Sequence, residues 1–219
     1  MTRLRRKPRQ QRSIASWHAV LDAAAQLFGE LGYARTTTNK VAERAGVSIG
    51  TLYQYFPNKD ALLLALADRH MAEAGAGLER AFALLSQQQP DLEQTLEVLI
   101  DAVVALHRHD PAMHRLLVDL APRTPEAVAR LRRLEQAAAE AVEAQLRRLG
   151  VGGRSPRSRA MLIVQGIEAQ VHGAVLDPPE GVSTEELVAE IKLLWLGALR
   201  AETAAGSAGR RAAPPPTSQ

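Results

Sequence analysis

Apolar residues recur at spacings of three and four along most of the chain, and no stretch alternates with a period of two. Because an α-helix repeats every 3.6 residues, such a spacing places apolar side chains on one helical face. A half-buried β-strand would need strict alternation instead. The pattern therefore predicts an all-α fold. The first helix shows it with Ile14, Trp17, Leu21, Ala24, Phe28 and Leu31.

Glycine, proline and capping residues divide this pattern into about nine predicted helices. Gly32 is a natural left-handed stop for the first, and Ser48 and Asn58 can cap the third and fourth. Ser183 and Glu186 form a capping box for the last helix, which we expect to end near residue 202. The expected helices span about 14–31, 38–45, 49–56, 58–88, 91–109, a short stretch from 111, 125–149, 156–176 and 184–202.

Composition excludes several classes of protein. The chain has no cysteine, which rules out a disulfide scaffold, a thiolate metal site and a cysteine nucleophile. No apolar run approaches the roughly 20 residues that a membrane span needs, and the basic N-terminus lacks the apolar segment of a signal peptide. We therefore expect a soluble cytoplasmic protein that does not interact with membranes.

Positive charge is concentrated at the N-terminus. Arg210 and Arg211 add two charges at the other end, and the remaining basic residues are outnumbered by the 24 acidic ones. This asymmetry favours contact with a polyanion at one end only, although basic tails also simply aid solubility. The arm over residues 1–12 contains Arg3, Arg5, Arg6, Lys7, Arg9 and Arg12.

Residues 37–59 carry the most informative motif, TTNKVAERAGVSIGTLYQYFPNK. A short helix, a tight turn at Gly46 and a second short helix form the helix-turn-helix layout, in which the second helix enters the major groove of DNA. Around this second helix stand hydroxyl, amide and ammonium groups suited to bases and phosphates. An ordinary three-helix core with exposed tyrosines is the alternative interpretation.

The sequence resembles the TetR family of regulators over residues 15–67. The resemblance is carried by AAAQLFGELGY at the end of the first helix and by TTTNKVAERAGVSIGTLYQYFPNKDALL after it. It implies an N-terminal three-helix helix-turn-helix domain followed by a larger C-terminal helical bundle. We expect an arm over 1–12, a DNA-binding domain over 13–58, a ligand-sensing and dimerisation domain over 59–202, and a disordered tail over 203–219.

The resemblance assigns roles to individual positions. Thr37 and Thr38 would contact backbone and base, and Asn39 would read a base. Tyr53, Tyr55 and Lys59 would hold phosphates. Thr38 and Ile49 depart from what the family often has there, so the operator sequence does not transfer from relatives; Ile49 suits a thymine methyl. The basic arm would reach the minor groove or flanking phosphates. The residues implied to lie in the major groove are Ser48, Ile49, Gly50, Thr51 and Gln54.

Family architecture also implies a homodimer formed through the last two long helices. Two copies related by a two-fold axis match a palindromic operator with half-sites one DNA turn apart. The alternative is that the apolar faces of these helices only cover the chain's own core. The expected interface residues are Ile163, Ile167, Gln170, Ala174, Leu187, Leu194, Trp195 and Leu199.

A mostly apolar pocket in the C-terminal domain is expected to take a hydrophobic or amphiphilic effector. Glu168 and His172 share a helix face, and an internal ion pair or hydrogen bond is the alternative to a ligand anchor. His107 and His109 point to different faces, so we expect no metal site, and no cofactor. The candidate effector residues are Leu106, Met113, Leu117, Met161, Gln165, Glu168 and His172.

The sequence therefore predicts a ligand-responsive transcriptional repressor that binds double-stranded DNA as a dimer and is released by a small molecule. A constitutive or architectural DNA-binding protein without an effector is the alternative. No nucleophile elbow, phosphate loop, HExxH helix or Glu-rich metal motif is present, so we do not expect an enzyme.

Overall fold

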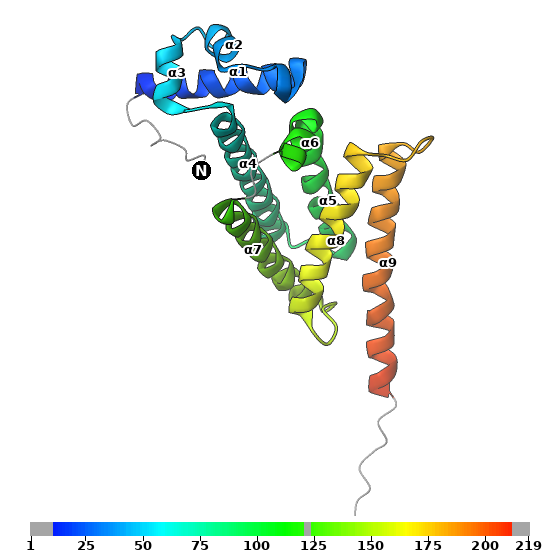
Figure 1. Cartoon of the computed structure of the whole chain (residues 1–219). Helices are drawn as coiled ribbons and strands as arrows, with labels where there is room; N and C mark the ends of the chain where they lie inside the picture. The colour runs from blue at the N-terminus through cyan, green and yellow to red at the C-terminus, as the bar shows by residue number, and fades with distance from the viewer. Residues whose placement is uncertain (1–10, 121–123, 212–219) are drawn as a thin grey trace, which may run out of the picture. The chain divides into compact units, whose positions relative to one another are not determined.

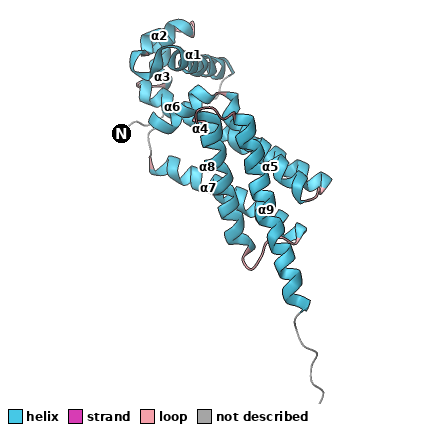
Figure 2. Cartoon of the chain, turned by 90° about the vertical axis from the view of Figure 1, so that its right-hand side faces the viewer, coloured by secondary structure: helices cyan, strands magenta, loops and turns pink. Residues whose placement is uncertain are grey.

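The computed structural model describes residues 11–120 and 124–211, which contain nine α-helices and no strand (Figures 1 and 2). This confirms the all-α prediction. None of the helices in these two ranges is long and apolar enough to cross a membrane. The helices are α1 (Gln11–Arg35), α2 (Thr38–Arg44), α3 (Ile49–Tyr55), α4 (Lys59–Gln88), α5 (Leu92–His109), α6 (Pro111–Leu120), α7 (Pro125–Leu149), α8 (Pro156–Leu176) and α9 (Thr184–Arg211).

Side-chain caps begin many of these helices, as the sequence predicted. In each case a side-chain oxygen accepts the backbone N–H three residues further on, which satisfies a donor that the helix itself cannot pair. The Ser183–Glu186 box is closed in both directions: Glu186 N–H donates to Ser183 Oγ at 3.2 Å, and Ser183 N–H donates to Glu186 Oε2 at 2.9 Å. The single caps are Ser48 at 3.0 Å, Asn58 at 2.9 Å, Asp110 at 2.9 Å and Thr124 at 3.1 Å.

The last helix is longer than the sequence predicted. α9 continues to Arg211, whereas we expected it to end near residue 202 and a disordered tail to follow. Residues 203–211 read TAAGSAGRR, and alanine is the strongest helix former, so helix can continue through them despite two glycines. The remaining part of the expected tail, 212–219, lies outside the described residues.

The chain divides into two compact units. One comprises residues 1–74 and 110–129, and the other comprises residues 75–109 and 130–219, so α4 passes from the first into the second. The first turns of α4 are part of the first core. Leu62, Leu63 and Leu66 of α4 are buried there, together with Met113 and Leu117 of α6.

The second unit has its own apolar core, to which α5, α8 and α9 contribute. These three helices pack against one another (Figure 1). Four residues that the sequence assigned to a dimer face are buried in this core of the single chain. They are Ile163, Ile167, Ala174 and Leu199, with exposed fractions of 1%, 3%, 4% and 2%.

A glycine allows the close approach of α8 and α9. A Cβ atom added at Gly166 would lie 2.5 Å from Cζ2 of Trp195. The Trp195 ring cannot easily move aside, because its Nε1–H donates to Gln170 Oε1 at 2.8 Å. Trp195 and Gln170, both expected in the dimer face, are therefore bonded to each other within one chain.

Gly166→Ala should lower the free energy of unfolding of the second unit by about 1–3 kcal/mol, because the added methyl overlaps the Trp195 ring. Chemical denaturation followed by circular dichroism measures the change. Gly173→Ala is the matched control on the same helix, since nothing lies within 4 Å of its added Cβ. That substitution should stabilise the helix by about 0.5–1 kcal/mol. Equal effects at the two positions would contradict the packing argument.

Candidate DNA-binding site

The turn between α2 and α3 has the geometry that a helix-turn-helix requires. Gly46 adopts a φ of 66°, which disfavours residues with a side chain. Its N–H donates to Glu43 O at 3.1 Å, and Val47 N–H donates to Ala42 O at 3.0 Å. This pair of bonds is a Schellman motif, which pairs the last carbonyl groups of α2 and sets the direction in which α3 leaves.

α3 has one buried and one exposed side. Leu52 and the residue that ends the helix, Phe56, are both 0% exposed. Away from Leu52, the helix presents two pairs of residues to solvent: Ile49 is 38% and Tyr53 is 42% exposed, and Gly50 and Gln54 are also exposed. Of the residues expected in the major groove, Ile49, Gly50, Gln54 and the capping Ser48 are therefore exposed, whereas Thr51 is half-buried.

Two hydroxyl contacts order the rim of this face. Ser48 Oγ lies 2.8 Å from Thr51 Oγ1, besides capping the helix through the Thr51 N–H. Tyr53 OH lies 3.1 Å from Thr38 Oγ1, which links α3 to the first turn of α2. Thr37 caps α2 by accepting the Lys40 N–H at 3.3 Å. These contacts hold the hydroxyl groups of both helices in defined positions before any DNA binds.

The other predicted contact residues differ in exposure. Asn39 is exposed on α2, whereas Tyr55 is half-buried, with its ring centroid 6.3 Å from that of Phe56. Of the basic arm, Arg12 is exposed in the first turn of α1. Arg3, Arg5, Arg6, Lys7 and Arg9 lie outside the described residues.

Lys59 has partners that the sequence did not indicate. Its Nζ donates to the Tyr33 carbonyl oxygen at 2.8 Å and lies 3.4 Å from those of Ala34 and Thr36. The same ammonium is 4.2 Å from the centre of the Tyr33 ring, within the range of a cation–π contact. In this structure Lys59 therefore holds the end of α1 against the start of α4.

Asp60 acts beside Lys59 on the same tyrosine. The Tyr33 hydroxyl donates to Asp60 Oδ1. Burial, and then the hydrogen bond to this carboxylate, raise the pKa of Tyr33 to about 12, so the phenol stays neutral at physiological pH. The first turn of α4 thus contacts the C-terminal end of α1 through the side chains of Lys59 and Asp60.

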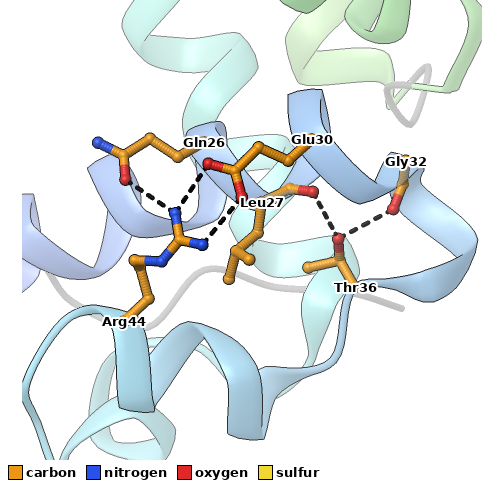
Figure 3. Close-up of polar contacts among 6 residues, drawn as sticks. All are labelled: Gln26, Leu27, Glu30, Gly32, Thr36 and Arg44. Carbon is orange, nitrogen blue, oxygen red and sulfur yellow. Dashed lines mark hydrogen bonds and ion pairs between the residues drawn. The ribbon is translucent and has the colours of Figure 1, made fainter.

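A buried threonine makes the break in α1 possible (Figure 3). Gly32 leaves the helical conformation with a φ of 75°, which confirms the predicted stop. Thr36 is 0% exposed, and its Oγ1 donates toward the carbonyl oxygens of Leu27 at 3.0 Å and of Gly32 at 2.9 Å. The hydroxyl therefore satisfies carbonyl groups that the break leaves without helical partners. Sequence analysis missed this role, although a threonine four residues after a glycine stop was visible.

An ion pair fixes α2 against α1 (Figure 3). Both Nη atoms of Arg44 lie 2.9 Å from the Glu30 carboxylate oxygens, and Arg44 Nη1 also donates to Gln26 Oε1 at 3.3 Å. The hydrogen bond from Arg44 lowers the pKa of Glu30 below its usual value. This two-point geometry restricts rotation of α2 more than a single bond would.

The expected effector residues fall into both units. Met113 and Leu117 belong to the core of the first unit. Leu106, Met161, Gln165, Glu168 and His172 belong to the second, where Met161 packs against the core and Glu168 is exposed. The second unit also has a surface depression of about 250 Å³ between α5 and α9, lined by other residues: Asp101, Val104, Arg108, Glu185, Val188, Ala189 and Lys192.

Lys59→Met should lower the free energy of unfolding by about 1–2 kcal/mol, because it removes a charged donor from the carbonyl groups at the end of α1. Thermal and chemical unfolding of the full chain measure the loss. Lys40→Met is the matched control, since Lys40 Nζ donates to a single exposed carbonyl, that of Arg35, at 3.1 Å. A stability loss no larger than that of the control would contradict the positioning role of Lys59.

Comparisons with known proteins agree with this geometry. Residues 20–66 match the family model for bacterial regulatory proteins of the tetR family, and residues 91–199 match the model for the tetracyclin repressor-like C-terminal domain. The HTH-type regulator EthR of Mycolicibacterium smegmatis is 25% identical over 196 residues, which cover 87% of this chain and 88% of EthR. The regulator YvkB of Bacillus subtilis is 44% identical over 61 residues, covering 28% of this chain and only 32% of YvkB.

Solved structures show the same fold. The SmeT–triclosan complex has a TM-score of 0.57 and 25% identity, covering 82% of this chain and 90% of SmeT. Four further structures, 19–21% identical, have TM-scores of 0.63–0.68. The matched regulators are DNA-binding transcription factors and not enzymes. The two family matches, the helix-turn-helix geometry and the fold lead to one conclusion: the chain belongs to the TetR family of transcriptional regulators.

Proposed function

We propose that this chain is a transcriptional repressor that binds a palindromic operator as a homodimer and is released by a small, hydrophobic effector. The exposed face of α3 is the observation that carries the proposal. Ile49, Gly50, Tyr53 and Gln54 stand together on a helix whose opposite side is anchored in the core. A helix presented in this way can enter the major groove without rearrangement.

The exposed groups of this face divide into those that can contact DNA bases and those that can contact the phosphate backbone. The Gln54 amide can donate to and accept from adenine, and the Ile49 side chain can touch a thymine methyl. Gly50 lets the helix backbone come close to the bases. The Tyr53 and Thr38 hydroxyls lie 3.1 Å apart, so one donates to the other and the second O–H can donate to a phosphate.

The basic arm adds sequence-independent affinity. Arg12 lies exposed at the first turn of α1, and the five further cations between Arg3 and Arg9 precede it. We assign the arm to the minor groove or to phosphates flanking the half-site. Because the proposed target is duplex DNA, we place the action of the protein in the cytoplasm.

Exposed leucines on α8 and α9 support a dimer. Leu162 is 64%, Leu193 60% and Leu194 59% exposed, values unusual for large apolar side chains that stay in water. Gly197 and Ala198, one turn after the α9 pair, are exposed and small enough for a helix to approach closely. We assign the interface to this face, which keeps Leu194 from the expected set and omits its buried members.

A small-molecule effector is supported by the relatives. The triclosan complex of SmeT shows a small apolar molecule bound to a protein of this fold. In this chain, Leu106, Met161 and Gln165 remain candidates for effector contacts. The effector would release DNA by binding better to a dimer whose two α3 helices are wrongly spaced for the operator.

Selection of bound duplexes from a random pool, at fixed salt, tests the operator. The wild-type chain should enrich an inverted repeat. Gln54→Ala and Thr51→Ala should change which bases are enriched. At each affected base, the free-energy difference between the preferred and the other bases should fall by about 1–3 kcal/mol. Tyr53→Phe should weaken binding about 3–10-fold on every sequence without changing the preference, since a phosphate contact carries no base information.

Gln94→Ala serves as the control for these variants, because Gln94 is an exposed glutamine of α5 in the other unit. It should leave both affinity and preference unchanged. A selection that enriches no sequence, or identical effects of all three α3 variants on every duplex, would refute the assigned roles. A selected operator whose binding responds to no small molecule would point to the constitutive regulator instead.

Leu193→Glu combined with Leu194→Glu should convert the dimer into a monomer in sedimentation equilibrium, because two carboxylates would be buried against an apolar partner. Operator affinity should fall as well, because a monomer cannot contact both half-sites at once. Leu131→Glu is the control, because Leu131 of α7 is 46% exposed but lies on another helix. A dimer that survives the double substitution places the interface elsewhere.

A further inference from the structure

Lys59, for which the family resemblance implied a phosphate contact, has its ammonium group bound to the backbone of its own chain. Nζ donates to the Tyr33 carbonyl oxygen at 2.8 Å and lies 3.4 Å from the carbonyl oxygens of Ala34 and Thr36. An ammonium has three N–H donors, so three carbonyl groups can occupy all of them. Binding a phosphate through Lys59 would therefore break contacts that hold the end of α1.

Arg44, a second cation of the helix-turn-helix, is also paired. Its two Nη atoms lie 2.9 Å from the carboxylate oxygens of Glu30 (Figure 3). The lysine and arginine residues between positions 13 and 66 are Arg35, Lys40, Arg44 and Lys59. Because Arg44 and Lys59 are held by partners within the chain, Arg35 and Lys40 are the cations of this segment that remain for a ligand.

Lys40 is exposed in the first turn of α2 and keeps donors for an external acceptor. Its Nζ donates to one carbonyl oxygen, that of Arg35, at 3.1 Å, which leaves two N–H groups. Within residues 11–120 and 124–211, no carboxylate pairs with Lys40, although Glu43 follows it by three positions. The positive charge of Lys40 is therefore available to an anion from solvent.

Arg35 lies beside Lys40 at the end of α1 and is also exposed. Its Nε donates to the Leu31 carbonyl oxygen at 2.8 Å, which holds the guanidinium near the last turn of α1. No carboxylate in the described part of the chain pairs with it, so its two Nη amino groups can donate to an anion. A guanidinium presents these donors in a planar fork that matches the oxygens of a phosphate.

Both cations lie at the end of α2 where the hydroxyl groups of the DNA-binding site are found. Thr37 caps this end by accepting the Lys40 N–H, and the Thr38 hydroxyl lies 3.1 Å from that of Tyr53 on α3. Thr38 and Lys40 are two residues apart, which is about 200° around the helix. A DNA strand that crosses the start of α2 would therefore meet hydroxyl groups toward α3 and positive charges on the opposite side.

We propose that Arg35 and Lys40 bind phosphates of the DNA strand beside the groove that α3 enters, in place of Lys59. The inference rests on the proposed DNA-binding function and names two residues that supply its sequence-independent part. Phosphates flank each groove of a duplex, and neutralising them with cations releases counterions, which favours binding. Lys59 then acts as a positioning residue that holds α1 against α4.

The test measures binding of the full-length chain to a duplex of random sequence, by fluorescence anisotropy at a series of salt concentrations. The logarithm of the affinity falls linearly with the logarithm of the salt concentration, with a slope of about −0.9 per phosphate neutralised. Lys40→Gln and Arg35→Gln should therefore each make the slope about 0.9 less steep. Lys40→Arg should keep the wild-type slope, because it keeps the charge and the donors.

Two further variants separate a phosphate contact from other effects of losing a charge. Lys59→Gln should lower the thermal midpoint but keep the wild-type slope, measured at a temperature where circular dichroism shows an intact fold. Lys40→Gln should keep the thermal midpoint, because lysine and glutamine have similar helix propensities. Arg132→Gln is the control for charge, since it removes an exposed cation of α7 in the other unit and should change neither quantity.

The inference is overturned if Lys40→Gln or Arg35→Gln keeps the wild-type slope. It is also overturned if Lys59→Gln or Arg132→Gln reduces the slope as much as these two variants do. All of these outcomes leave DNA binding itself in place. A wild-type chain that binds no duplex at low salt, with its fold intact, would instead refute the proposed DNA-binding function and this inference with it.

Discussion

The DNA-binding unit depends on how the end of α1 is held. A helix that stops at a glycine leaves carbonyl groups unpaired, and an unpaired buried carbonyl is costly. Here Thr36 Oγ1, inside the core, and Lys59 Nζ, at the start of α4, donate hydrogen bonds to these carbonyl groups. Because α2 begins two residues after Thr36, this anchor sets where the helix-turn-helix starts.

Three further contacts connect the end of α1 to the exposed face of α3. The Arg44–Glu30 pair limits rotation of α2 against α1, and the Schellman turn at Gly46 sets the direction of α3. Burial of Leu52 then determines which side of α3 faces away from the core. The exposed groups of α3 are therefore oriented by contacts within the protein, those of Lys59 among them.

The second unit distributes its apolar residues between core and surface along the same two helices. On α8 and α9, Ile163, Ile167 and Leu199 face inward, while Leu162, Leu193 and Leu194 face water. The inward contact is tight enough that only a glycine fits against Trp195. The outward leucines form the face to which we assign the dimer interface, and His107 of α5 lies 3.6 Å from the Glu168 carboxylate of α8.

The sequence alone determined the all-α fold, the capped helix starts and the helix-turn-helix motif. These features depend on periodicity and on bonds between residues three to five apart, which a sequence displays directly. Only the tertiary structure decided that Lys59 binds carbonyl groups, that Ile163 and Leu199 lie inside the chain, that Met113 belongs to the first core, and that His107 faces Glu168. Periodicity shows that a helix has an apolar or polar face, but it does not show which helix that face meets. The partners of these residues lie on elements far away in the chain, and packing alone brings them together.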